Sequence, residues 1–169
     1  FARPLFDSNI ASLVDAEPES AVILMDVSMS MGYGARFVRA QDAARDVIED
    51  LAHGDEVAIV VFDNATVSVR ELSTDLEGAR SFVDALSEPS FEVTRYMPAL
   101  RLPKDMLASA RPEQRSSHLF SEYQARGMGN EDSGWLLSPV VPLNTIDVGE
   151  GSQRNRLLRA AGSPEPLLD

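Results

Sequence analysis

The chain of 169 residues contains no cysteine, and this absence excludes two kinds of architecture. Neither a disulfide framework nor a thiolate metal site can exist without cysteine. Basic residues are also scarce, since 15 Lys and Arg stand against 27 Asp and Glu, which gives a net charge of -12. Such a balance disfavours a nucleic-acid backbone or an anionic membrane surface as a partner. We therefore expect no binding to nucleic acid and no direct membrane contact by this chain.

Long apolar runs are absent as well, because none approaches the ~20 residues that a membrane helix needs. The length fits one domain with a single sizeable core. The sequence begins at Phe1 without an initiator Met, so we expect a fragment of a longer protein. Prolines and little periodicity in residues 1–20 and 150–169 predict an irregular lead-in and a tail or linker. The domain itself is expected at 21–149.

Within these bounds, apolar runs of strand length alternate with amphipathic helical patterns. The predicted elements, in chain order, are a strand at 21–25, a helix at 37–51, a strand at 57–62, a short returning strand at 66–69, a helix at 76–86, a third helical stretch after 94, a strand at 117–121 and a strand at 143–148. This alternation predicts an α/β, Rossmann-like open and mostly parallel sheet with helices on both faces. The expected strand order is 3-2-1-4-5, with the third strand as an antiparallel edge.

Two helix starts have recognisable local chemistry. Thr74 followed by Glu77 forms a capping-box pattern for the second helix. In the third helical stretch, Pro98 suits a first turn, whereas Pro103 removes a donor and clashes with the preceding turn. We expect a kink at Pro103, or a helix that begins only near that residue.

Polar side chains follow the first buried strand directly. Asp26, Ser28 and Ser30 occupy every second position after five apolar residues. Open α/β sheets place ligands at the carboxyl ends of their strands, near the point where the strand order reverses. The three side chains offer only hard oxygen atoms, which suit Mg²⁺, Mn²⁺ or Ca²⁺ better than Zn²⁺ or Cu²⁺. The pattern therefore favours a site for a hard cation.

Other interpretations of this stretch remain open. Asp and Ser after a strand commonly cap the next helix. A phosphotransferase with Asp26 as nucleophile, as in haloacid-dehalogenase-like enzymes, needs a second acid where Ser28 stands. Nucleotide binding through Gly32 and Gly34 fails, because Phe37 occupies the third glycine position of that fingerprint.

The Asp-x-Ser-x-Ser stretch resembles the first metal-binding loop of the von Willebrand factor A domain family, whose site is called the metal-ion-dependent adhesion site. That family takes a Thr from a second loop and an Asp from the end of the fourth strand. The resemblance covers roughly residues 21–149. The matching residues are Asp26, Ser28, Ser30, Thr94 and Glu122, the last of which departs from the family's Asp.

The resemblance implies a set of roles for these residues. Ser28, Ser30 and Thr94 would ligate the ion directly, while Asp26 and Glu122 would act mostly through bound water. A sixth position would stay open for a carboxylate of a protein partner. Three neutral hydroxyls neutralise little of the ion's charge, so this position would prefer an anionic ligand. Affinity for the bare ion should be weak, on the order of 10⁻⁴–10⁻³ M. The departure at Glu122 predicts a site that is empty or weakly occupied without abundant metal and that tolerates Ca²⁺ relatively well.

Within the family, two stretches are similar to bacterial membrane-anchored members such as the Bat aerotolerance proteins. These stretches are 31–34, Met-Gly-Tyr-Gly, and 146–149, Ile-Asp-Val-Gly. In such proteins an Ala-Arg-Pro closes a second membrane helix just before the domain, as residues 2–4 do here. The resemblance implies a parent protein that is anchored in a membrane by a preceding segment, with this domain on the extracytoplasmic side.

No pair of nucleophile and base stands out in the sequence. The sequence therefore predicts a non-enzymatic protein-interaction module that binds a divalent cation and, through it, an acidic group of a partner. The main alternative is a structural domain of the same family whose metal site has degenerated at Glu122. The phosphotransferase that uses Asp26 is less favoured.

Overall fold

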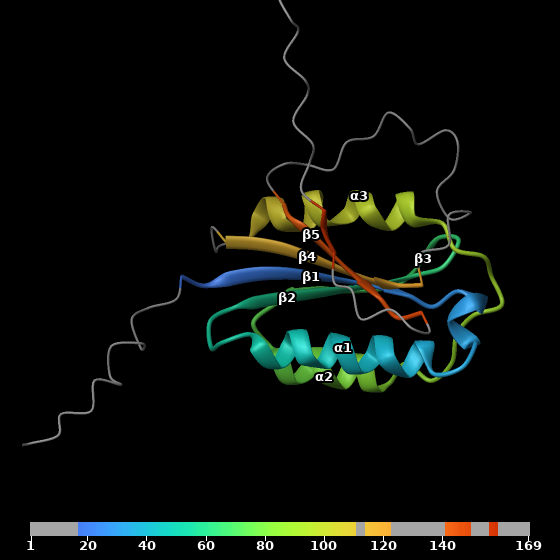
Figure 1. Cartoon of the computed structure of the whole chain (residues 1–169). Helices are drawn as coiled ribbons and strands as arrows, with labels where there is room; N and C mark the ends of the chain where they lie inside the picture. The colour runs from blue at the N-terminus through green and yellow to red at the C-terminus, as the bar shows by residue number, and fades with distance from the viewer. Residues whose placement is uncertain (1–16, 111–113, 123–140, 150–155, 159–169) are drawn as a thin grey trace, which may run out of the picture.

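The computed structural model describes residues 17–110, 114–122, 141–149 and 156–158 (Figure 1). The strands in this part of the chain are β1 Glu19–Asp26, β2 Glu56–Phe62, β3 Thr66–Ser73, β4 Gln114–Ser121, β5 Leu143–Asp147 and β6 Arg156–Leu158. They form one sheet in the order β3-β2-β1-β4-β5-β6. The inner strands β2, β1, β4 and β5 run parallel to one another, while β3 and β6 run antiparallel at the two edges.

The predicted α/β sheet, its order 3-2-1-4-5 and its antiparallel third strand are confirmed. The structure adds β6, which pairs with β5 and lies inside the segment that was predicted to be a tail. Three residues are too few to show a strand periodicity, so the sequence pattern could not reveal this strand. The predicted lead-in falls mostly outside the described residues, as does the remainder of the predicted tail.

Helices cover both faces of the sheet, as predicted. α1 Arg36–Asp50 and α2 Leu76–Asp84 lie on one face, and α3 Tyr96–Met106 lies on the other (Figure 1). Two short 3₁₀ helices, η1 Met29–Gly32 and η2 Leu107–Ser109, complete the described helices. None of these helices is long and apolar enough to cross a membrane.

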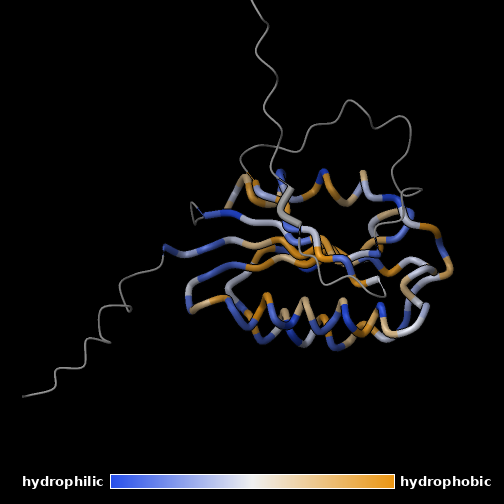
Figure 2. Tube along the Cα trace, in the orientation of Figure 1, coloured by the Kyte–Doolittle hydropathy of each residue, from blue (hydrophilic) through white to orange (hydrophobic). Residues whose placement is uncertain are grey.

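The alternation of side chains along β1 divides the core into two layers. Ala21, Ile23 and Met25 belong to the cluster shared with α1 and α2, whereas Val22 and Leu24 belong to the cluster shared with α3. All five are fully buried, which explains why the run is apolar without interruption. Figure 2 shows the same arrangement, with apolar residues concentrated in the central strands and polar residues on the outer sides of the helices.

The start of α2 corrects the predicted capping box. Its N-cap is Asp75 and not Thr74, and the Asp75 Oδ1 atom accepts a hydrogen bond from the Gly78 backbone N–H at 2.9 Å. A carboxylate at this position satisfies a backbone donor of the first helical turn and interacts favourably with the positive end of the helix dipole. Both residue types cap helices well, so the sequence placed the cap one residue early.

The start of α3 corrects a second expectation. The helix begins at Tyr96, so the predicted late start near Pro103 is wrong. Pro98 is the third helical residue, where no intrahelical donor is required. Pro103 is buried inside the helix, and only three helical residues follow it before the chain tightens into η2. The disruption by Pro103 is thus confined to the final turn, while a bend at this residue stays a prediction.

We expect Asp75→Ala to lower the free energy of unfolding by about 1 kcal/mol, because the Gly78 N–H loses its partner. Chemical denaturation measures this loss. Asp75→Asn is the matched control, since Asn caps as well as Asp but removes the charge that Arg70 contacts. Thr74→Ala should change stability by less than about 0.5 kcal/mol. A larger loss for Thr74→Ala than for Asp75→Ala would restore the capping-box interpretation.

Candidate metal centre

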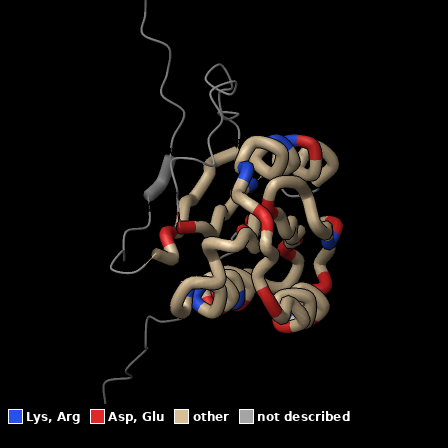
Figure 3. Tube along the Cα trace, turned by 90° about the vertical axis from the view of Figure 1, so that its right-hand side faces the viewer, with Lys and Arg blue, Asp and Glu red and all other residues tan. Residues whose placement is uncertain are grey.

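The candidate site lies where the carboxyl ends of β1 and β4 meet. Met25 pairs with Phe120 in the parallel ladder, so Asp26 and Ser121 come to the same edge of the sheet. This edge is the topological switch point, because β2 follows on one side of β1 whereas β4 lies on its other side, so the strand order reverses here. Figure 3 views the molecule from this end, with the helices above and below the strands.

Two backbone hydrogen bonds hold the second predicted loop against the first. The Met29 N–H donates to the Glu92 carbonyl at 2.8 Å, and the Ser90 N–H donates to the Val27 carbonyl at 2.6 Å. A third bond, from the Arg95 N–H to the Asp63 carbonyl at 2.8 Å, fixes the residue next to Thr94. Residues far apart in the sequence are therefore placed in contact by the backbone before any metal is considered.

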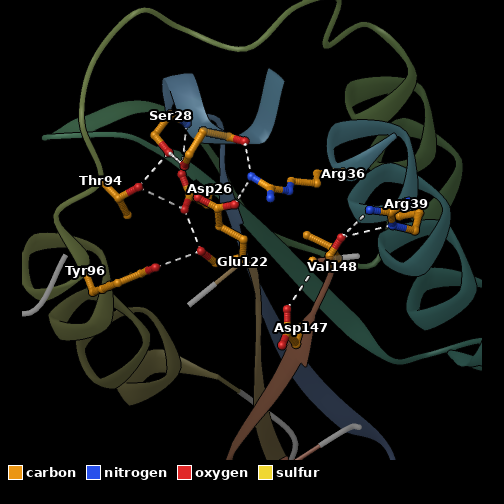
Figure 4. A network of polar contacts seen from close by, with 12 residues as sticks. Asp26, Ser28, Arg36, Arg39, Thr94, Tyr96, Glu122, Asp147 and Val148 are labelled. Atoms are coloured by element: carbon orange, nitrogen blue, oxygen red, sulfur yellow. Dashed lines mark hydrogen bonds and ion pairs between the residues drawn. The ribbon is translucent and has the colours of Figure 1, made fainter. Parts of the chain in front are cut away.

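Asp26 is the fully buried centre of this region. Its Oδ1 accepts a hydrogen bond from the Ser28 backbone N–H at 2.9 Å. Its Oδ2 accepts one from the Ser121 hydroxyl at 2.6 Å and another from the Thr94 hydroxyl at 3.3 Å. Burial raises the pKa of Asp26 above its ordinary value, while these hydrogen bonds oppose the rise. One carboxylate thus joins the first loop, the second loop and the end of β4 (Figure 4).

The three predicted hydroxyl ligands converge. The Ser28 Oγ atom lies 2.6 Å from the Thr94 Oγ1 atom and 3.1 Å from the Ser30 Oγ atom. Adjacent ligands of an octahedral Mg²⁺ at 2.0–2.1 Å are about 3 Å apart, so the observed spacing suits neighbouring positions on one ion. Among the described residues no cluster of three His, Cys, Asp or Glu side chains could hold a metal. The three hydroxyl oxygens are hard donors of the kind that suit Mg²⁺, Mn²⁺ or Ca²⁺.

Glu122 reaches the same region but points to a different partner. Its side chain is 4% exposed and its Oε2 forms an ion pair with the Arg36 guanidinium (Figure 4). The same Arg36 Nη1 donates a hydrogen bond to the Ser30 carbonyl at 2.9 Å. The structure thus brings Asp26, Ser28, Ser30 and Thr94 together through direct hydrogen bonds, and connects Glu122 to them through Arg36.

Three residues of this network were not singled out by sequence reasoning. Ser121 donates to Asp26, and the Tyr96 hydroxyl lies 2.9 Å from the Ser121 Oγ. Ser121 ends the predicted fourth strand directly before Glu122, so its position was a usable signal. Arg36 belongs to the polar side of the first predicted helix, and helical periodicity cannot show which acid such an arginine meets. Tyr96 follows Thr94 by two positions and gave no signal of its own.

Comparison with known proteins identifies the family and similar folds. The sequence profile of the von Willebrand factor type A domain matches residues 21–122, which is more than half of the chain. No curated protein matches the chain. The fold is similar to the conserved hypothetical protein BatB from Bacteroides thetaiotaomicron, with a TM-score of 0.61 and 14% identity over 84% of this chain and 80% of that one.

Two further structural relatives extend the likeness. An aerotolerance-related membrane protein from Bacteroides fragilis NCTC 9343 gives a TM-score of 0.60 and 16% identity, over 83% of this chain and 81% of that one. The vWF domain structure of the type V pili tip protein Mfa5 from Porphyromonas gingivalis gives a TM-score of 0.53 and 20% identity over 61% of this chain. This chain spans only 37% of that pilus protein and 23% of a longer, three-domain Mfa5 structure.

At these identities the structural likeness concerns the fold, whereas the sequence profile establishes the family. The profile begins at Ala21 in β1 and ends at Glu122 directly after β4, so it spans all the predicted site residues. The chain belongs to the von Willebrand factor type A domain family, and bacterial Bat-type domains are among its structural relatives.

Proposed function

We propose that this domain binds a divalent cation through Ser28, Ser30 and Thr94 and, through that ion, an acidic group of a partner protein. The observation that carries the proposal is the convergence of the three hydroxyls beside the buried Asp26. Three neutral ligands leave most of the charge of a divalent ion uncompensated. An anionic side chain of a partner is then the preferred further ligand.

The residues of the proposed site have distinct parts in this arrangement. The Asp26 carboxylate accepts hydrogen bonds from the Ser28 backbone N–H and from the Thr94 hydroxyl, so it holds the first and second loops close together. The bound cation would supply a Lewis-acidic position for a partner's carboxylate. By the resemblance to the family, Asp26 and Glu122 would act mainly through water bound to the ion. Mg²⁺, Mn²⁺ and Ca²⁺ are the ions that suit these oxygen donors.

The relatives support an interaction role on a cell surface. One is an aerotolerance-related membrane protein, another is a tip protein of type V pili, and a third is an adhesive tip pilin from Group B Streptococcus agalactiae. We infer that this domain belongs to a bacterial protein that is tethered to a membrane, that it faces the extracytoplasmic side, and that it recruits another protein without catalysing a reaction. Asp26 is enclosed by donors from three segments, an environment suited to a structural carboxylate.

One observation favours a second candidate, a structural domain of this family that no longer binds metal. Glu122 stands where the family has Asp, and its carboxylate pairs with Arg36. A site loses function when one of its groups moves by about 1 Å. Metal titration of the isolated domain distinguishes this candidate from the proposed function.

The proposed site predicts that millimolar Mg²⁺ or Mn²⁺ raises the melting temperature. For dissociation constants on the order of 10⁻⁴–10⁻³ M, 10 mM ion adds about 1.4–2.7 kcal/mol of stability. That corresponds to roughly 3–10 °C for a domain of this size. Ser28→Ala should abolish the rise, whereas the exposed Ser81→Ala should keep it. An unchanged melting temperature in the parent, or an equal rise in Ser28→Ala, would contradict the proposal.

The departure at Glu122 makes a separate prediction. Glu122→Asp should tighten Mg²⁺ binding by ~1 kcal/mol, or roughly fivefold, because outer groups that hold a metal's water commonly affect affinity by 10–100-fold or less. Mg²⁺ should gain more than Ca²⁺, since Mg²⁺ demands more regular coordination. Calorimetric titration of both ions measures the difference. If Glu122→Asp fails to tighten binding and Glu122→Ala has no effect, Glu122 lies outside the site.

Recruitment through the ion predicts a partner whose capture depends on metal. The immobilised domain should retain a binding protein from membrane extracts in Mg²⁺ and release it on addition of chelator. Ser28→Ala should capture none, and Ser81→Ala should capture as much as the parent. Phosphatase turnover by the domain that disappears in Asp26→Asn would instead establish the enzyme alternative.

A further inference from the structure

Arg36 links two of the three loops that form the candidate site. It is the first residue of α1, and its Nη1 atom contacts both the Ser30 carbonyl and the Glu122 carboxylate. Its guanidinium also lies over the Tyr33 ring, 5.7 Å from the centroid. The guanidinium therefore contacts the first loop at the Ser30 carbonyl and the third loop at the Glu122 carboxylate (Figure 4).

The environment of this ion pair increases its influence. The Glu122 side chain is 4% exposed and the Arg36 side chain is 22% exposed, so water screens the pair weakly. The Glu122 Oε1 atom is buried and has no hydrogen-bond partner in the part of the chain that the structure describes. The contact with the Arg36 guanidinium is made by the other carboxylate oxygen, Oε2.

We propose that Arg36 is an internal counter-cation for Glu122, with which a divalent ion at the hydroxyl cluster must compete. This inference rests on the proposed function and names the residue that limits its metal affinity. A guanidinium beside the site repels an incoming cation and reduces the negative charge that Glu122 presents to it. Arg36 is a positioning residue in this scheme, because it acts through Glu122 and through the Ser30 backbone.

The length of the Glu122 side chain fits this role. Glu122 carries the same charge as the Asp that the family has at this position, but it extends one methylene further. In this structure the longer side chain ends at Arg36. The longer acid and the neighbouring arginine therefore act together. Their ion pair lowers the affinity of the site for a cation and stabilises the two loops when no metal is bound.

The test compares two arginines of α1. Arg36→Gln removes the counter-cation, whereas Arg39→Gln removes the same charge from a side chain that donates to the Val148 carbonyl at 2.7 and 3.0 Å. We expect Arg36→Gln to lower the Mn²⁺ dissociation constant about tenfold, a size typical of groups around a metal's direct ligands. Arg39→Gln and the charge-conserving Arg36→Lys should stay near the parent. Calorimetry with Mn²⁺ alone provides the dissociation constants.

A second measurement separates this role from a purely structural one. Without metal, Arg36→Gln should melt at a lower temperature than the parent, because Glu122 is left buried without its partner. With Mn²⁺, the same variant should show the larger rise in melting temperature. In a Glu122→Gln background, Arg36→Gln should have much less effect on metal affinity, since the carboxylate for which the cations compete is gone.

Several results would overturn the inference. Unchanged or weaker Mn²⁺ binding in Arg36→Gln would show that Arg36 is structural only. The proposed function would still stand in that case if the parent binds Mn²⁺ and Ser28→Ala does not. If Arg36→Gln does not fold, NMR of the parent decides: the Arg36 Nε–H signal should shift during Mg²⁺ titration while that of Arg39 does not. An Arg36 signal that stays fixed at saturating metal refutes the competition. Absence of metal binding in the parent and every folded variant refutes the proposed function as well.

Discussion

A buried carboxylate organises this end of the molecule. Asp26 sits at the end of the central strand, where water is excluded, and a charge in such a place is costly unless donors surround it. Those donors come from the Ser28 backbone, the Thr94 hydroxyl and the Ser121 hydroxyl. Because these residues belong to different segments, satisfying one carboxylate requires the loops around it to converge.

The same requirement brings the candidate ligands together. Thr94 lies 66 positions from Ser28, yet their hydroxyl oxygens are 2.6 Å apart. Their proximity follows from the parallel ladder of β1 and β2, because the Arg95 N–H donates to the Asp63 carbonyl directly after β2. The hydrogen bonds between the first two loops and the shared acceptor Asp26 act in the same direction. The scaffold therefore holds the three hydroxyls together in advance, and side chains that are already fixed by their neighbours lose little further freedom on binding a ligand.

Charge determines how strongly such a site would attract a cation. The chain carries a net charge of -12, but net charge says little about one location. At the candidate site the three hydroxyls are neutral, Asp26 accepts hydrogen bonds from Ser28, Thr94 and Ser121, and Glu122 is paired with Arg36. The local balance is much less negative than the composition implies.

Most of the fold could be predicted from the sequence because each inner element carries its own periodic signal. Apolar runs marked β1 and β2, and amphipathic spacing marked α1. Signals that depend on a few residues are weaker. The cap of α2 is Asp75 and not Thr74, and of the two alternatives for α3 the late start near Pro103 is wrong, while the pattern gives no sign of β6. A strand of three residues owes its existence to its pairing partner and not to its own pattern.

For the candidate site, the sequence by itself determined that Asp26, Ser28 and Ser30 follow a buried strand at every second position, and the family resemblance added Thr94. Only the tertiary structure decided which charges meet. Glu122 and Arg36 are separated by most of the domain in sequence, and helical periodicity states merely that Arg36 faces away from the core. Their pairing depends on how α1 packs beside the end of β4. Long-range electrostatic partners are set by the packing of whole elements, which no local pattern of residues records.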